Sequence, residues 1–169
     1  MKRDRFETVV ARSSQKLYNY LLRMLRSRED AEDILQEVFI AFYDKMPKVD
    51  EEFCESYLYR AAHNKAINLI KKRSRTTELE MPELLLSNEK VFDPEQAMQE
   101  EKNAKVREAI GRLNEREASA LNLQYYENKS YQEIAEIMDS TVSAVDSLLI
   151  RAKRKLKKIL SQDYGSGDV

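Results

Sequence analysis

Apolar side chains recur at three- and four-residue steps through much of the chain, the spacing that gathers them on one face of an α-helix. The alternation of apolar and polar residues that is typical of a half-buried β-strand is hard to find. Gly and Pro number three each, while Leu, Ala, Glu, Lys and Arg, which favour helices, are abundant. The pattern therefore predicts an all-α protein.

Residues 5–26 predict a first amphipathic helix. Its apolar members are Phe6, Val9, Val10, Leu17, Leu21, Leu22 and Leu25. A second helix is expected to open at Ser27, whose hydroxyl can cap a free backbone N–H, and to run to about Lys45. Asp30 stands in its first turn, where the helix dipole favours an anion.

The second helix has an apolar side and an acidic side. The apolar side consists of Ile34, Leu35, Val38, Phe39 and Phe42. The acidic side consists of Asp30, Asp33, Gln36, Glu37 and Asp44. Ile40 lies within the acidic side, although a surface that only meets water has no need of it. From these residues alone, a solvated face and a face that binds a partner both remain open.

A third helix is predicted from about Phe53 to Lys72, after the polar loop Lys48–Glu52. Its apolar side consists of Leu58, Ala62, Ala66, Leu69 and Ile70. The opposite stripe consists of Tyr57, Arg60, Asn64, Asn68 and Lys71, joined by Lys65 and Lys72. Such a stripe suits unstacked bases, because rings stack on bases, amides read base edges and cations meet phosphates. A charged face that only meets water is the alternative.

Capping patterns mark three helix starts in the second half of the chain. Asp93-Pro94-Glu95-Gln96 has a capping residue followed by proline at the first helical position, and Asn114-Glu115-Arg116-Glu117 repeats the capping logic. Ser130-Tyr131-Gln132-Glu133 has the full capping-box pattern and opens a short helix that ends at Met138. These starts predict a second helical domain.

The turn Asp139-Ser140-Thr141 and a last helix from Val142 to Leu160 complete a helix-turn-helix, in which the second helix reads the major groove of DNA. The core side of this helix consists of Val145, Leu149, Ala152 and Leu156. Its outer side consists of Ser143, Ser147, Ile150, Arg151, Arg154 and Lys158, with Asp146 at the edge. A basic amphipathic helix for a membrane or an acidic protein is the alternative.

Charges are segregated along the chain although they sum to only −1. Six cations and no acid lie between Arg60 and Arg75, and six more cations lie between Arg151 and Lys158. Between these blocks, residues 78–101 carry eight acids and one lysine. We therefore predict two positively charged helical surfaces held apart by a negative connector, because the local field steers a charged ligand.

The expected domains are residues 1–77, an acidic linker 78–92, residues 93–162 and a tail 163–169. Leu84, Leu85 and Leu86 interrupt the linker, and either local packing or a partner groove explains them. Cys54 and His63 are the single cysteine and the single histidine, too few for a structural zinc site or a disulfide. We expect no metal or cofactor. Since neither a signal peptide nor a membrane span is visible, we expect a cytoplasmic location.

The order of motifs resembles bacterial sigma factors of the extracytoplasmic-function group, the small two-domain specificity subunits of RNA polymerase. Residues 30–39, DAEDILQEVF, are similar to the helix that docks on the polymerase clamp. Residues 56–64, SYLYRAAHN, with the cations at 71–73, are similar to the segment that melts and reads the −10 element. Residues 113–117, 131–135 and 151–156 resemble the −35 reader. The resemblance covers nearly the whole chain.

This resemblance implies a transcription initiation factor rather than an enzyme, which binds core RNA polymerase, promoter DNA and an anti-sigma factor and forms no stable homo-oligomer. The expected polymerase contacts are Asp30, Asp33, Gln36, Glu37 and Ile40. The expected −10 contacts are Lys48, Tyr57, Tyr59, Arg60, Asn64, Asn68, Lys71 and Lys72. The expected −35 contacts are Thr141, Ser143, Asp146, Ser147, Ile150, Arg151, Arg154 and Lys155.

Family roles and departures both follow from the same alignment of motifs. The Lys48–Glu52 loop and Asn64 would hold a flipped base, Tyr57 and Tyr59 would support the melted strand, and the connector would thread a basic polymerase channel. The departures from the family pattern are Tyr57 for tryptophan, Asn68 for aspartate, Asp139 for the turn glycine, and Asp146 and Leu148 for cations that touch DNA.

Two other functions explain part of the sequence. An ordinary helix-turn-helix regulator with a dimerisation domain accounts for residues 114–160, but it does not predict the stripe that contains Arg60 and Asn64. A helical hydrolase using the carboxylates of residues 30–37 would need a basic or histidine partner or metal ligands, which this face does not supply.

Overall fold

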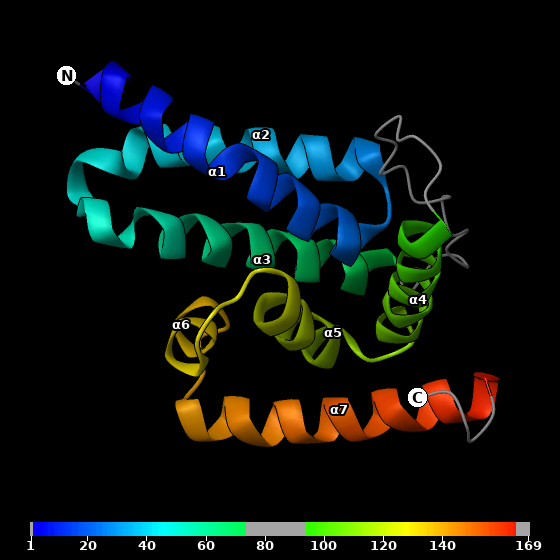
Figure 1. The fold of residues 1–169 in the computed structure, drawn as a ribbon. Coiled ribbons are helices and arrows are strands. Elements are labelled where there is room, and N and C mark those ends of the chain that lie inside the picture. The colour runs from blue at the N-terminus through cyan, green and yellow to red at the C-terminus, as the bar shows by residue number, and fades with distance from the viewer. Residues whose placement is uncertain (1, 74–93, 165–169) are drawn as a thin grey trace.

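The computed structural model describes residues 2–73 and 94–164, and every regular element in these two segments is helical (Figure 1). The all-α prediction is confirmed. The acidic linker 78–92, with Leu84–Leu86, and the capping residue Asp93 lie outside the described residues.

The N-terminal unit consists of α1 (Lys2–Leu25), α2 (Arg28–Lys45) and α3 (Cys54–Arg73), with the short 3₁₀ turns η1 (Met46–Lys48) and η2 (Glu51–Phe53). The predicted cap is confirmed, because the hydroxyl oxygen of Ser27 accepts from the backbone N–H of Asp30 at 3.3 Å. The helices pack on one another through their apolar faces. The side chains at the centre include Leu17, Leu21, Val38, Phe42, Leu58 and Ala62.

The C-terminal unit consists of α4 (Pro94–Gly111), α5 (Glu115–Leu121), the π-helical turn η3 (Asn122–Tyr126), α6 (Tyr131–Ile137) and α7 (Val142–Tyr164). Asn114 caps α5, and Ser130 forms the predicted capping box with Glu133. The last helix extends four residues beyond Leu160, where its expected end lay. The helix-turn-helix prediction for α6 and α7 is confirmed.

The two units pack directly against each other. Figure 1 shows α5 and α6 lying between α3 on one side and α7 on the other, and contacts join α3 to α6 and α1 to η3. Their buried side chains form one continuous apolar cluster. The expectation of two surfaces held apart is therefore wrong for this conformation, because the touching faces carry both apolar groups and opposite charges.

Candidate nucleic-acid interface and partner surfaces

The acidic side of α2 is an open surface. Asp33, Gln36, Glu37 and Ile40 are exposed, and Ile40 keeps 68% of its accessible area although it is surrounded by polar side chains. Oε2 of Glu37 forms an ion pair with Nζ of Lys65 on α3 at 3.2 Å. Asp30 differs from the others, because it is half-buried and pairs with Arg73 at the end of α3.

The polar stripe of α3 is also mostly exposed. Its exposed members are Arg60, Asn64, Asn68, Lys71 and Lys72. Tyr57 is half-buried, with its ring centroid 5.8 Å from that of Phe42, so only part of its face can meet a base. Lys48 is exposed at the end of η1.

Tyr59 does not lie on this exposed stripe. Its accessible area is 0%, and its hydroxyl donates to Oε2 of Glu127 at 2.6 Å. Burial, and then the hydrogen bond and negative charge of Glu127, raise the pKa of Tyr59 above its usual value. A contact between Tyr59 and a melted strand, as the sequence predicts, is therefore ruled out in this conformation. The reason is that the loop after η3 covers this side of α3.

The outer side of α7 is as the sequence predicts. Thr141 caps the helix by accepting from the backbone N–H of Ala144 at 3.1 Å. The exposed side chains are Ser143, Asp146, Ser147, Ile150, Arg151, Arg154 and Lys158, whereas Val145, Leu149 and Ala152 are buried. Asp139 has a φ of 51°, the left-handed conformation that the turn requires and that aspartate tolerates better than most residues.

Lys155 has a structural partner that the sequence analysis does not identify. Its ammonium contacts Oε1 of Glu117 at 3.0 Å, and Glu117 is 1% exposed at the third position of α5. The ion pair joins α5 to the recognition helix. In the sequence, Glu117 stands out only as an acid three residues after the capping Asn114. That position indicates a role at the helix cap and does not indicate a pair with Lys155.

His63 is a core residue. Its Nδ1 lies 3.0 Å from the hydroxyl of Tyr20, and burial, with a smaller effect of the Arg116 charge, lowers its pKa to about 4. The imidazole is therefore neutral at neutral pH. Among the described residues, no three His, Cys, Asp or Glu side chains gather as metal ligands would.

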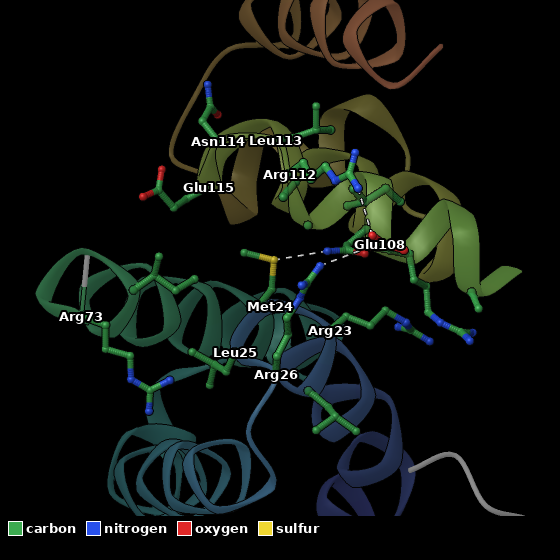
Figure 2. A pocket seen from close by; sticks show the side chains of 18 of the residues that line it. Arg23, Met24, Leu25, Arg26, Arg73, Glu108, Arg112, Leu113, Asn114 and Glu115 are labelled. Carbon is green, nitrogen blue, oxygen red and sulfur yellow. Dashed lines mark hydrogen bonds and ion pairs between the residues drawn. The ribbon is translucent and has the colours of Figure 1, made fainter. Parts of the chain in front are cut away.

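Two cavities lie where the units meet. The larger, about 900 Å³, is bounded by the ends of α1 and α3 and by α4 and α5. Figure 2 shows Met24 of α1 and Arg26, just after α1, beneath Glu108 of α4 and Arg112, just after α4. The smaller, about 400 Å³, lies between α3 and α7, with Ile67 on one wall and Leu148 on the other.

The larger cavity is basic, but its arginines already have partners. Arg112 pairs with Glu108 at 3.0 Å, Arg23 with Glu127 at 2.9 Å, and Arg26 donates to the carbonyl of Arg107 at 3.4 Å. Such a lining is typical of a gap between two packed units. Within residues 2–73 and 94–164, no helix combines the length and the apolarity needed to cross a bilayer.

Comparison with known proteins connects these surfaces to one family. The family model "Sigma-70 region 2" matches residues 9–76, and "Sigma-70, region 4" matches residues 103–156. The first match contains α2 and α3, and the second contains α5, α6 and most of α7. Each matched region therefore lies largely within one helical unit.

Full-length relatives and solved structures agree with this division. The RNA polymerase sigma-H factor of Pseudomonas aeruginosa is 31% identical over 92% of this chain and 86% of its own length. The sigma-E factor of Haemophilus influenzae, of the extracytoplasmic-function group, is 31% identical over 90% of this chain and 85% of its own.

Two solved structures share the fold. The sigma factor RpoE of Bartonella quintana, in complex with the anti-sigma factor NepR, aligns with a TM-score of 0.73 and 17% identity, over 94% of this chain and 98% of the other. CnrH, in complex with the cytosolic domain of CnrY, aligns with a TM-score of 0.68 and 21% identity, over 94% and 88%. The chain therefore belongs to the sigma-70 family as an RNA polymerase sigma factor of the extracytoplasmic-function group, a transcription initiation factor that directs the polymerase to promoters.

Proposed function

We propose that three surfaces of this chain divide the work of promoter selection. The acidic face of α2 docks on core RNA polymerase, the stripe of α3 reads the −10 element, and the outer side of α7 reads the −35 element. One observation carries this proposal: two cation-bearing helical faces, on α3 and α7, each lie opposite a buried apolar side within one chain. A single-site regulator needs only the second.

The docking face combines Asp33, Gln36 and Glu37 with the exposed Ile40. Charge complementarity of such a face raises the rate of encounter with a basic partner, whereas an apolar anchor at its centre supplies affinity. Asp30 contributes less, because it already pairs with Arg73.

On α3, Arg60, Lys71 and Lys72 meet the phosphates of the opened strand, and Asn64 and Asn68 offer amides to unpaired bases. The Lys48–Glu52 loop joins Asn64 in holding a flipped base. Unstacking a base costs a few kcal/mol, which these polar contacts must offset.

On α7, Arg151 and Arg154 contact the DNA backbone or guanine edges, and Ser143, Ser147 and Ile150 contact base edges. Thr141, which caps α7, lies at the same end of the helix as Ser143. Asp146 accepts from cytosine amino groups or stays at the rim of the DNA groove. Lys155 contributes charge to the same side while it holds Glu117.

The other partners follow from the family. An anti-sigma factor is the proposed inhibitor, since one solved neighbour of the same fold is a sigma factor in complex with an anti-sigma factor. The factor works in the cytoplasm as one copy per polymerase, and no catalysis by its own side chains is proposed.

The test is transcription in vitro with bacterial core polymerase on selected promoters. Replacing both Arg60 and Asn64 by Ala should reduce permanganate reactivity of the opened strand at least about tenfold, while core binding stays unchanged. Arg12→Ala, which removes an exposed cation on α1, is the control and should change neither. An intact permanganate footprint in the double variant would contradict the assignment of α3.

A further inference from the structure

A carboxylate of the C-terminal unit is buried against the N-terminal unit. Glu127, whose side chain is 7% exposed, accepts from the hydroxyl of Tyr59 at 2.6 Å and from Nη1 of Arg23 at 2.9 Å. The guanidinium of Arg23 also lies 4.2 Å from the ring centroid of Tyr126. Hydrogen bonds that involve a charge are stronger than neutral ones, and burial shields this group from solvent screening.

A second ion pair lies two residues further on. Lys129, whose side chain is 10% exposed, donates to Oε1 of Glu55 at 2.8 Å and lies 4.6 Å from the ring centroid of Tyr59. Glu55 also pairs with Lys16 at 3.6 Å. Glu127 and Lys129 together thus contact both α1 and α3.

The backbone between these two side chains has a fixed shape. Asn128 adopts a left-handed conformation with a φ of 53°, which asparagine tolerates. The backbone N–H of Lys129 donates to the carbonyl of Leu123 at 3.0 Å, and that of Glu127 donates to Asn122 at 3.2 Å. Because the loop is tied to η3, both side chains are preset for the N-terminal unit.

These contacts bring the two proposed DNA-reading helices to one cleft. Arg60 of α3 pairs with Asp139 of the helix-turn-helix turn at 3.2 Å. Lys71 of α3 and Arg151 of α7 both line the 400 Å³ cavity. Elements centred at −10 and −35 lie about 25 base pairs apart, or about 85 Å at 3.4 Å per base pair. Two helices that share one cleft cannot span this distance.

Two departures from the family pattern belong to this closed arrangement. Asp139, where the family resemblance implies a glycine, pairs with Arg60 across the interface. Leu148, where the resemblance implies a cation, is buried and lines the cleft opposite Ile67 and His63. A cation at position 148 would instead add a fifth positive charge to a cleft that already contains Lys71, Arg116, Arg151 and Lys155 against Glu115 and Glu117.

We propose that Glu127 and Lys129, with their partners Arg23, Tyr59 and Glu55, form an intramolecular latch that keeps the two promoter-reading units closed in the free chain. The acidic face of α2 stays exposed in this state, so polymerase docks first and opening follows. On opening, Tyr59 is released from Glu127, and Arg60 of the α3 stripe is released from Asp139. This inference rests on the proposed function.

The first test measures opening in the free chain, without polymerase. Single labels are placed at exposed positions of the two units, Arg12→Cys on α1 and Lys153→Cys on α7, while the native Cys54 is fully buried. Förster transfer and X-ray scattering are then compared for the wild type, the variant E127A/K129A and the control E136Q, which alters an exposed carboxylate on α6. Circular dichroism checks that each variant is folded.

We expect the wild type and E136Q to be compact, and E127A/K129A to shift the open population at least about tenfold, since each lost charge-assisted hydrogen bond weakens closure. Its affinity for a single-stranded −10 oligonucleotide should rise by a similar factor. An extended wild-type chain, or a folded E127A/K129A chain as compact as the wild type, would overturn the proposal.

The second test closes the chain covalently. Lys16 and Lys129 both contact the Glu55 carboxylate, so K16C/K129C can be bridged by a short reagent that dithiothreitol cleaves. The bridged chain should bind core polymerase but lose at least about 90% of promoter opening, and cleavage should restore it. Full opening activity while bridged would refute the latch. Loss of polymerase binding by the unbridged chain would instead count against the proposed function.

Discussion

The exposed Ile40 gives the sharpest test of the docking face. A folded domain gains nothing from an isoleucine that is 68% exposed among acids, whereas a partner that covers it gains apolar burial. We therefore predict that Ile40→Ala weakens binding to core polymerase and leaves the free energy of unfolding unchanged within about 0.5 kcal/mol.

The size of the effect follows from the exposed area. The substitution removes three carbons, worth about 0.8 kcal/mol each when fully buried, and the 68% of the side chain that is still exposed scales this to about 1.6 kcal/mol. At 1.4 kcal/mol per tenfold change, the dissociation constant should rise by a factor of about 15.

Ile34→Ala on the same helix is the matched control. Ile34 is 5% exposed and lies in the core, so its truncation should cost about 2–4 kcal/mol of stability. Fluorescence anisotropy with labelled factor and core polymerase measures binding, and urea unfolding measures stability. If Ile40→Ala bound polymerase as tightly as the wild type, α2 would not be the docking face in the manner argued. If it lost stability like Ile34→Ala, its side chain would belong to the core.

Two further predictions concern buried ionisable groups. The pKa of His63 is about 4 in the folded chain and 6.5 in the unfolded chain, so the unfolded state binds more protons between these values. The free energy of unfolding should therefore fall as the pH drops from 6.5 to 4, by about 3 kcal/mol in total. Urea unfolding of His63→Asn should lack this part of the pH dependence, and an unchanged slope would contradict it. Lys155→Met leaves the Glu117 carboxylate buried without its ion pair and should cost about 1–3 kcal/mol, discounted because Lys155 is largely exposed. The double variant E117Q/K155M should recover most of that stability in the same assay; a double variant as unstable as the single one would show that the pair is not the cause.

Local patterns predicted most of the helices and their faces. The caps at Ser27, Asn114 and Ser130 and the outer row of α7 depend on residues within four positions of one another, and these interactions are the same in any fold. The left-handed turn at Asp139 was also predictable, because it needs a residue that tolerates positive φ.

Contacts between the units could not be predicted in this way. Tyr59 and Glu127 are 68 positions apart, and nothing near either residue indicates the other. On the helical wheel Tyr59 falls between Ala66 and Ile70 on the apolar side of α3, so its burial was predictable, whereas its partner Glu127 was not. The cover over Leu148 was missed for the same reason. The pairing of Lys155 with Glu117 lies within the second unit, but its partners are 38 positions apart and it was missed as well.

The segregation of charge explains why closure needs a specific latch. Lys71 on α3, Arg116 on α5, and Arg151 and Lys155 on α7 line one cleft that also contains Glu115 and Glu117 of α5. The cations outnumber the acids there, and like charges oppose association of the units. Glu127, Glu55 and Asp139 form ion pairs across the interface with Arg23, Lys129 and Arg60, and Glu127 is almost fully buried, where screening is weakest. Promoter DNA would neutralise the same cations only in an open chain, in which α3 and α7 can reach separate promoter elements. On the proposed assignment, the basic side chains of α3 and α7 therefore favour opening, and the acids at the interface favour the closed state of the free chain.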